Sequence, residues 1–402
     1  MMMNMNKRFN LKYGASMTGF FSLFASMFSF VSVYLLHNGY DNATIGTVLA
    51  FTGISTIIIQ TMQASFLDKR PLFRLQDAIS INLILVLIGA AIILLTNSNR
   101  LILGLIVFIF AFAQASETLL NSMAFIFERF GIEINYGFGR GMGSAAFAVM
   151  TMIIGYIVEA TTPNAIPLFY LVLAAILLLL VRSYKHPLEK EEHPEEVQDT
   201  LDEMEVTDNT LIDFFKRYKR LVVLMVGVIC MMFTHTLVNN FFIQIITPIG
   251  GNSALMGNAI FIGAIVELPA MFGYQRIESR ISANSLLKIA AVFFLAKHVL
   301  TFFASNMYVI YIAQFLQIGG FALIYPACVS YIRAMVSKKD AVKGQSLFTS
   351  AIAASSVLGS FVGGILLDEL GVPATLIAGI IANTIGLIVI FIATEDKKIA
   401  VK

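Results

Sequence analysis

Long apolar runs recur along this 402-residue chain and constrain its fold more than any other feature. The mean hydropathy is +0.81, and 58% of residues are hydrophobic against 13% charged. About 20 apolar residues in a helix span the roughly 30 Å of a bilayer's hydrocarbon core. Twelve such runs lie at about 13–37, 43–66, 76–96, 101–127, 137–160, 164–183, 221–247, 253–275, 284–305, 307–332, 345–367 and 371–394. We therefore expect an all-α polytopic membrane protein with 12 transmembrane helices.

The first run is too long for a signal peptide, and no small-residue cleavage site follows it, so we interpret it as the first membrane helix. Basic residues favour one side of the twelve-span map, which predicts that both termini are cytoplasmic in a multi-pass protein of the cell membrane. Those assigned to the cytoplasmic side outside the central loop are Lys7, Arg8, Lys12, Lys69, Arg70, Arg74, Arg129, Arg276, Arg280, Lys288, Arg333, Lys338, Lys339, Lys343, Lys397, Lys398 and Lys402. Arg140 lies near that side, and Arg100 and Lys297 fall elsewhere.

One long polar stretch divides the runs into two sets of six. Residues 184–219 are acid-rich at first and end in basic residues, which is typical of a solvated linker followed by an interfacial anchor. The sequence thus predicts an N-terminal six-helix bundle at 1–183, a cytoplasmic linker at 184–219 and a C-terminal six-helix bundle at 220–402.

The two sets also resemble each other at matching places. The loop after run two reads FLDKR and the loop after run eight reads GYQRIE, while run five opens RGMGS and run eleven opens KGQS. Parallel repeats of this kind, with a site between them near the bilayer midplane, are a transporter architecture.

Four charged residues lie in or at the mouth of apolar runs: Glu117, Arg140, Glu267 and Lys297. Placing an ionisable group at bilayer depth costs roughly 2.5–3.5 kcal/mol even on the mildest scale, so such residues usually face an interior or a cavity. Arg140 offers a planar fork of donors for hydroxyls, a carboxylate or a phosphate, or it extends to the headgroups.

For the other three charges the alternatives also stay open. Glu267 is either a proton-exchanging group and substrate contact or one member of a structural ion pair. Glu117 is either a proton carrier or the partner of Arg140. Lys297 either pairs with Glu267 or extends to the outer interface.

Uncharged polar residues are candidates for the rest of a binding site. Asn239, Asn240 and Gln244 lie in run seven, and Gln314 and Gln317 share one helical face in run ten. Their amides suit a polyhydroxyl or amide-bearing solute; the alternative is hydrogen bonding between helices.

Enzyme chemistry has little support in the sequence. We find no nucleotide-binding loop, no metal-ligand cluster and no nucleophile–base spacing; the five histidines are scattered, and Cys230 and Cys328 lie in apolar runs. We expect no cofactor and no nucleic-acid partner, with a proton gradient as the driving force.

The layout resembles the major facilitator superfamily over essentially the whole chain. Asp68, Lys69 and Arg70 match a degenerate form of its signature loop, which in that family controls the cytoplasmic gate. Residues 135–148, NYGFGRGMGSAAFA, are similar to the start of span five in the lactose-permease-like branch, the oligosaccharide or nucleoside:proton symporters. The resemblance places a substrate-binding arginine on Arg140.

In run eight, the segment VEL places that branch's substrate-binding glutamate on Glu267, and Lys297 falls near its coupling arginine. The chain departs from the branch in run ten, where Gln317 and Gly320 stand in place of the histidine and the proton-carrying glutamate, and at Phe138, which replaces an arginine. A different proton carrier is therefore needed.

The resulting hypothesis is a secondary active transporter, a monomer in the lipid bilayer that couples protons to a small polar solute by symport. Sugars, oligosaccharides and nucleosides are the leading solutes by resemblance. The expected substrate contacts are Arg140, Glu267, Asn239, Asn240, Gln314 and Gln317, and the expected coupling residues are Glu117, Glu267 and Lys297. The alternatives are a proton-driven efflux antiporter for lipophilic or cationic compounds and a receptor that transports nothing.

Overall fold

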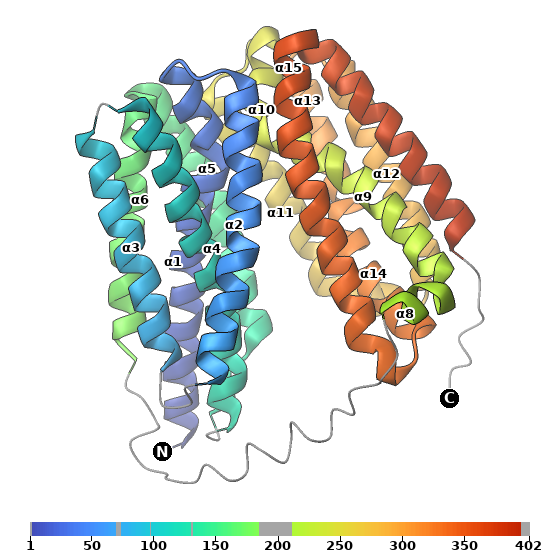
Figure 1. Cartoon of the computed structure of the whole chain (residues 1–402), viewed down its shortest axis with the longest axis horizontal. Coiled ribbons are helices and arrows are strands. Elements are labelled where there is room, and N and C mark those ends of the chain that lie inside the picture. The colour runs from blue at the N-terminus through green and yellow to red at the C-terminus, as the bar shows by residue number, and fades with distance from the viewer. Residues whose placement is uncertain (1, 70–73, 97, 130–131, 185–210, 395–402) are drawn as a thin grey trace.

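The computed structural model describes residues 2–69, 74–96, 98–129, 132–184 and 211–394, and the regular structure within these ranges is entirely helical (Figure 1). Within these described ranges, eleven helical segments are long and apolar enough to cross a membrane. One of them, α15 (Ala341–Ala393), contains a non-helical residue, Gly371, with φ 74° and ψ 177°. Because Gly371 divides α15 into two spans, the predicted set of twelve transmembrane helices is confirmed.

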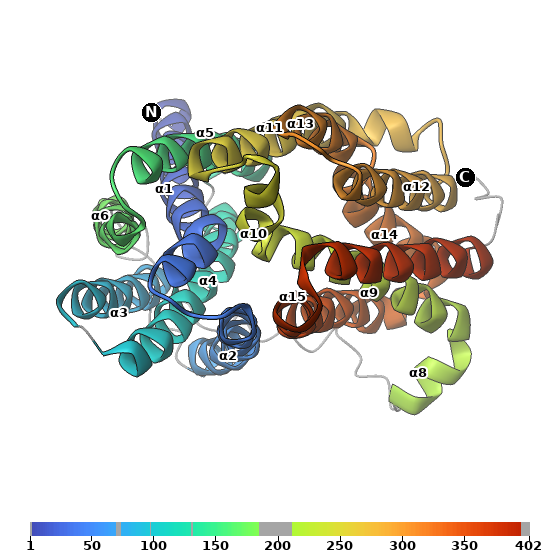
Figure 2. The ribbon, with the colours of Figure 1, turned by 90° about the horizontal axis from the view of Figure 1, so that it is seen from above.

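The helices form two halves that stand side by side (Figures 1 and 2). The N-terminal half consists of α1 (Met2–His37), α2 (Asn42–Asp68), α3 (Leu75–Leu95), α4 (Asn99–Arg129), α5 (Tyr136–Ala160), η1 (Pro163–Ala165) and α6 (Ile166–Arg182). The C-terminal half consists of α8 (Leu211–Arg217), α9 (Lys219–Asn240), α10 (Phe242–Ile246), η3 (Thr247–Ile249), α11 (Ser253–Glu278), α12 (Ala283–Phe302), α13 (Met307–Phe315), η4 (Leu316–Ile318), α14 (Phe321–Met335), η5 (Lys338–Asp340) and α15.

Two apolar windows are less regular than the sequence predicts. The window at 221–247 is divided into α9 and α10 at Phe241, whose φ and ψ are −113° and 29°. The window at 307–332 is divided into α13, η4 and α14, with Gly319 and Gly320 at the break. Hydropathy cannot detect such breaks, because an interrupted helix keeps the same apolar composition.

Polar side chains cap the first turns of several of these helices. Asp41 accepts a hydrogen bond from the backbone N–H of Thr44 at 2.7 Å, and Asn252 accepts one from Leu255 at 2.9 Å. The hydrogen bond from Thr44 lowers the pKa of Asp41 below its usual 3.8. Each cap satisfies a donor in the first turn that has no partner within its own helix.

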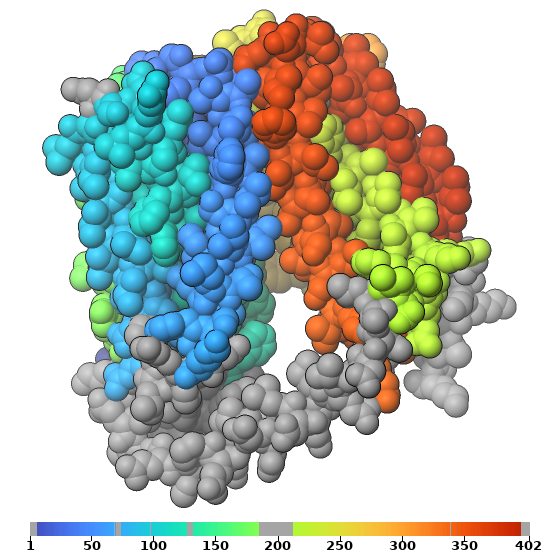
Figure 3. All heavy atoms as spheres, viewed as in Figure 1, coloured from blue at the N-terminus to red at the C-terminus, as the bar shows by residue number. Residues whose placement is uncertain are grey.

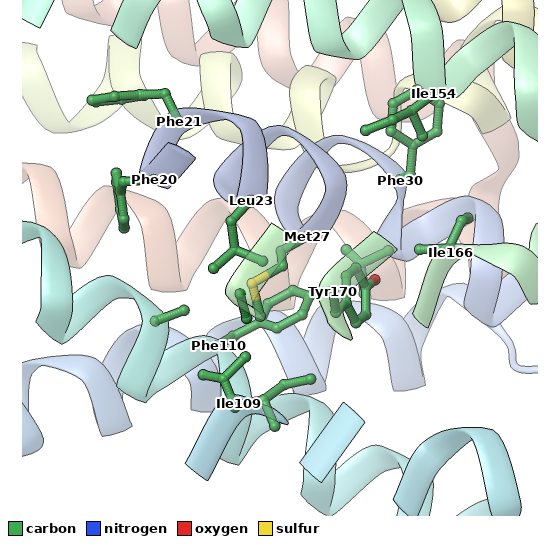
Figure 4. Close-up of a cluster of buried hydrophobic side chains, with 14 of the residues drawn as sticks. Phe20, Phe21, Leu23, Met27, Phe30, Ile109, Phe110, Ile154, Ile166 and Tyr170 are labelled. Carbon is green, nitrogen blue, oxygen red and sulfur yellow. The ribbon is translucent and has the colours of Figure 1, made fainter. Parts of the chain in front are cut away.

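The core of the N-terminal half lies between α1, α4 and α6 (Figure 4). Met27 of α1 and Phe110 of α4 are fully buried there with Tyr170 of α6. Elsewhere on the helices apolar residues are exposed, such as Leu95 of α3 and Ile392 of α15. Apolar residues that are exposed around a helical bundle are expected of a lipid-facing surface.

The halves meet along two helix pairs, α5 with α11 and α2 with α15 (Figure 2). Glycines bring the backbones together near the upper end of Figure 1: a Cβ at Gly46 would lie 2.3 Å from the carbonyl oxygen of Ser360, and one at Gly155 would lie 2.5 Å from that of Ser253. Toward the lower end the surfaces separate around a hollow (Figure 3). The molecule is thus closed at its upper end and opens toward the end from which α1 starts.

The basic end of the expected linker is attached to the C-terminal half. The carboxylate of Asp340 accepts hydrogen bonds from Tyr218 at 2.9 Å and Ser337 at 3.0 Å, and lies 3.6 Å from Arg217. Burial opposes ionisation of Asp340, but these hydrogen bonds and the charges of Lys343 and Arg217 together lower its pKa below 3.8. Residues 185–210 lie outside the described part, so the proposed domain boundaries stay a prediction.

Candidate functional site

Arg140 occupies the fifth position of α5 and is half-buried between the two halves. Its Nη1 donates a hydrogen bond to Ser144 Oγ at 3.1 Å, and its Cζ lies 4.2 Å from the centre of the Phe21 ring. An aromatic face attracts a guanidinium and holds it in place. The headgroup alternative does not fit this geometry, because the side chain packs against α1 within the protein.

The glycines around Arg140 make room for aromatic rings. A Cβ at Gly139 would lie 2.5 Å from the Tyr13 ring, one at Gly143 would lie 2.3 Å from Phe21, and one at Gly141 would lie 2.7 Å from Phe272. Gly139 and Gly143 therefore admit α1, while Gly141 admits α11 of the other half. The space that the alternating glycines leave is filled by protein, and it positions Arg140 instead of holding a ligand.

Both intramembrane carboxylates lie around Arg140. Glu117 of α4, in the same half, and Glu267 of α11, in the other half, are each half-buried and within electrostatic range of its guanidinium. The phenol of Tyr136 lies in range of both Glu117 and Arg140, as does Tyr325 of α14. One fixed cation thus faces acidic groups from both halves.

Lys297 of α12 is buried inside the C-terminal half, with 3% of its surface exposed. Its Nζ donates a hydrogen bond to Gln317 Oε1 at 2.5 Å, and it lies within electrostatic range of Glu267. Glu267 also interacts with Gln317. Lys297 and Glu267 therefore share one amide partner, an arrangement different from an interfacial lysine whose amine extends to the headgroups.

Gln317 lies at the break between α13 and α14. A Cβ at Gly319 would lie 2.3 Å from the Phe293 ring, so this backbone packs directly on α12. Gln314 is 5% exposed, and its Oε1 lies against Gly263 of α11. Irregular backbone at membrane depth is tolerated where it is buried in protein or lines a cavity. The glycine that replaces the family's glutamate thus marks an interrupted helix.

Two of the histidines, which the sequence-based interpretation regarded as scattered, come together beside Lys297. His298 is 1% exposed, and its Nδ1 lies 2.7 Å from both the Phe294 carbonyl and the Asn383 amide. His235 stacks on Phe321 with ring centres 4.8 Å apart. No local motif marks this group, because its members come from four helices, α9, α12, α14 and α15.

The predicted asparagines divide between two places. Asn239 donates a hydrogen bond to Nε2 of the half-buried His235 at 2.9 Å. Asn240 lies at the contact between the halves: its Nδ2 donates to Ser360 Oγ at 2.8 Å, and its carbonyl accepts a hydrogen bond from Ser32. Gln244 likewise donates to Asn42 of α2 at 3.0 Å. In this arrangement Asn240 and Gln244 join the two halves and lie apart from the charges around Arg140.

Of the predicted gating loop, the structure describes two positions. Asp68 is the last residue of α2 and Lys69 is its C-cap, whereas Arg70 lies outside the described residues. A role of this loop in gating stays a prediction.

A model of the MFS_1 like family matches residues 16–378. The chain belongs to this family. As a member of the MFS_1 like family it is a transporter of the major facilitator type and not an enzyme, and the predicted resemblance to that superfamily is confirmed. No curated protein sequence matches the chain significantly.

Solved structures of other transporters share the fold of this MFS_1 like protein. A mutant of the nucleoside transporter NupG superposes with a TM-score of 0.77 at 16% identity, covering 96% of this chain and 98% of that one. A mutant of the peptide transporter POT gives 0.72 at 13%, with 96% and 94% covered. A bacterial homolog of the human lysosomal transporter Spinster, in an inward-facing and unoccupied conformation, gives 0.64 at 14%, with 96% of each chain covered.

Proposed function

We propose that this transporter couples protons to the movement of a small polar solute by symport, with a sugar, an oligosaccharide or a nucleoside as the solute. One observation carries the proposal: Arg140 lies within electrostatic range of Glu117 in its own half and of Glu267 in the other half. A rearrangement of the halves must change the distance between Arg140 and Glu267, whereas Glu117 stays with Arg140 in the same half. The two access states therefore differ in how strongly they favour an ionised carboxylate.

Glu267 is the group best placed to link the proton to the solute. It lies near Arg140 in one direction and near Lys297 and Gln317 in the other. Protonating Glu267 removes its attraction to both cations and frees the donors of Arg140 for a solute. Arg140 then offers a planar fork that suits paired hydroxyls or a carbonyl group.

The similar structures support the solute class only in part. NupG is named as a nucleoside transporter and POT as a peptide transporter, and both superpose on nearly the whole chain. The residues around Arg140 are mixed in chemistry: α11, α12 and η4 bring charges and an amide, whereas α1 brings Phe21 against the guanidinium and Phe24 against Phe21, and Phe24 stacks on Phe28 with ring centres 4.5 Å apart. Such a mixture suits a solute with polar groups and a flat face.

We further propose that the lower end of Figure 1 faces the cytoplasm of a cell membrane and that the protein works as a monomer. Basic residues near this end include Lys69, Arg217, Arg276 and Arg333. An excess of lysine and arginine in short loops marks the cytoplasmic side. In this orientation the structure is open to the cytoplasm, and its upper end faces outward.

Uptake into liposomes tests the proposal. Purified protein should accumulate one member of a panel of nucleosides and sugars when an inward proton gradient is imposed, and an uncoupler should abolish the accumulation. Glu267→Gln should lose accumulation but keep solute exchange, while Glu278→Gln, at the end of the same helix, should keep both. Accumulation that survives the uncoupler, or that survives in Glu267→Gln, would contradict the assignment.

A second function, proton-driven efflux of lipophilic or cationic compounds, is favoured by the aromatic residues of α1 and α5. Phe24 and Phe28 are half-exposed, and the ring centre of Phe147 lies 5.9 Å from that of Phe24. The direction of transport separates the two functions. A gradient that drives a cationic dye against the proton flow, with no uptake of any nucleoside or sugar, would establish the antiporter instead.

A further inference from the structure

We propose that Glu159 and Asp368 form a pair of symmetry-related carboxylate latches that hold the upper ends of the two halves together. Each latch is a side chain near the end of one helix that binds the first turn of a helix in the other half. The consequence of the latches for transport rests on the proposed alternating access. The contacts themselves are present in the structure.

The Asp368 latch joins α15 to α2. Its Oδ1 accepts hydrogen bonds from the backbone N–H of Asn42 at 3.2 Å and from the side-chain amide of Asn42 at 2.7 Å. Its Oδ2 accepts a hydrogen bond from the backbone N–H of Ala43 at 2.6 Å. Both carboxylate oxygens are therefore engaged across the boundary between the halves.

The Glu159 latch joins α5 to α11. Its Oε2 accepts a hydrogen bond from the backbone N–H of Ser253 at 3.0 Å. Ser253 is the first residue of α11, as Asn42 is the first residue of α2. The same chemical contact thus occurs twice, once from each half toward the other.

The surrounding sequence repeats the arrangement in both halves. Glu159 follows Gly155 by four residues, and Asp368 follows Gly364 by four residues. On the receiving helices the glycines are also four residues beyond the first residue, at Gly46 in α2 and Gly257 in α11.

These glycines lie where the backbones of the two halves touch. A Cβ at Gly364 would lie 2.2 Å from the Asn42 carbonyl oxygen, and one at Gly257 would lie 2.4 Å from the Thr151 carbonyl oxygen. The glycines bring the backbones close enough for the carboxylates to reach.

The latches bind backbone N–H groups in the first helical turn that the N-cap side chains do not bind. The N-cap residues Asp41 and Asn252 each take the N–H of the third residue of their helices, Thr44 and Leu255. The carboxylate of the opposite half takes the N–H of the first residue, and in α2 that of the second as well. An anion at this position is also favoured by the helix dipole.

Because each latch joins different halves, both must release when the upper end opens. Asp368 and Glu159 are exposed, so water takes over the hydrogen bonds on release, and the latches bias the equilibrium instead of locking it. From the range for charges at helix ends, each should shift the ratio of closed to open molecules about twofold to thirtyfold. Two latches acting independently should multiply these factors.

Distance measurements between spin labels test the latches without any solute. Labels at Thr161→Cys and Ser305→Cys, in a background with Cys230 and Cys328 replaced by alanine, report the separation of the halves at the upper end. We expect a short distance in the parent, a longer population in Asp368→Asn and in Glu159→Gln, and the largest in the double variant. Glu369→Gln, which removes a neighbouring exposed carboxylate, should match the parent.

A double variant with the same distance distribution as Glu369→Gln would overturn the proposal. The result is separate from the transport assignment, because no proton gradient or solute enters the measurement. If the latch variants open while no solute follows a proton gradient in liposomes, the latches stand and the symport proposal fails.

Discussion

The two halves contribute to the central site in different ways. In the N-terminal half, Arg140 lies on the continuous helix α5, braced by Phe21 and Ser144. In the C-terminal half, Lys297 lies beside interrupted helices and bonds to Gln317 at a break. One half therefore holds its cation on a rigid surface, and the other holds it where the backbone departs from regular geometry.

This difference suggests separate tasks for the two halves. A guanidinium fixed by packing is suited to binding a solute, because little conformational entropy is lost when the solute arrives. Discontinuous helices at the midplane are typical of transporter regions that bind and rearrange. We expect changes in the N-terminal half to affect solute binding most, and changes in the C-terminal half to affect coupling and stability.

The largest effect should follow from Arg140→Ala. A hydrogen bond between a charged group and a neutral partner contributes about 1.5–3 kcal/mol, so solute affinity should fall roughly 10- to 150-fold. Arg140→Lys should restore only part of the loss, since lysine lacks the planar fork. Binding by isothermal calorimetry measures this, with the exposed Arg182→Ala as the control. Unchanged affinity in Arg140→Ala would remove the division of tasks between the halves.

Lys297→Met should destabilise the protein by about 3 kcal/mol, because it removes one of the two cations near the Glu267 carboxylate, the one in its own half. The double variant Lys297→Met/Glu267→Gln should be more stable than Lys297→Met, since it removes both charges. Thermal unfolding in detergent measures both differences. Equal stability of the single and double variants would show that the two charges do not act as a pair.

Gly319→Ala should destabilise the protein by about 1–3 kcal/mol, because its Cβ would lie 2.3 Å from the Phe293 ring. Adding Phe293→Ala should recover part of this loss by opening space. Gly104→Ala on α4 is the matched control, since no neighbouring atom lies within 4 Å of its Cβ. If Gly319→Ala melts like Gly104→Ala, close packing at the break is not required.

The smallest expected changes in stability concern the ionic contacts at the lower ends of the two halves. Asp340→Asn in the C-terminal half should lose about 1 kcal/mol at neutral pH, whereas Asp77→Asn, which breaks the exposed N-terminal pair with Arg182, should change stability by less than about 0.5 kcal/mol.

The effect of Asp340 should depend on pH with a definite sign. Its folded-state pKa is lowered from 3.8, so its stabilisation is fully present above that value and is lost as the pH falls through the lowered pKa. The difference in melting temperature between the parent and Asp340→Asn should therefore shrink as the pH is lowered from about 7 into the acid range. A difference that grows on acidification would contradict this sign.

Much of the fold followed from hydropathy and charge. The window at 253–275 matches α11 (Ser253–Glu278), and the window at 137–160 matches α5 (Tyr136–Ala160). Both breaks in the C-terminal half were missed, because Phe241 and Gly319–Gly320 lie inside apolar runs. The linker and Arg70 lie partly or wholly outside the described residues, so the sequence-based predictions there stay untested.

The site was only partly accessible from the sequence. Each of the four intramembrane charges stood out by itself, because a lone charge in an apolar run is visible without any partner. The surroundings of Lys297, with His298 and Asn383, gave no such signal, since polar residues in separate helices have no fixed spacing. Asn240 looked like a site residue in the sequence, yet it bonds Ser360 at the contact between the halves.

The sequence by itself determined that this chain spans a membrane with twelve helices and that a few charges must lie in its interior, because the hydrocarbon core excludes polar groups wherever they occur in the chain. Only the tertiary structure decided which charges face one another, where the helices break, and how Asp368 and Glu159 reach the other half. These features depend on contacts between different helices, in the latches between residues more than 90 positions apart, and they are set by the packing of whole helices and not by local pattern.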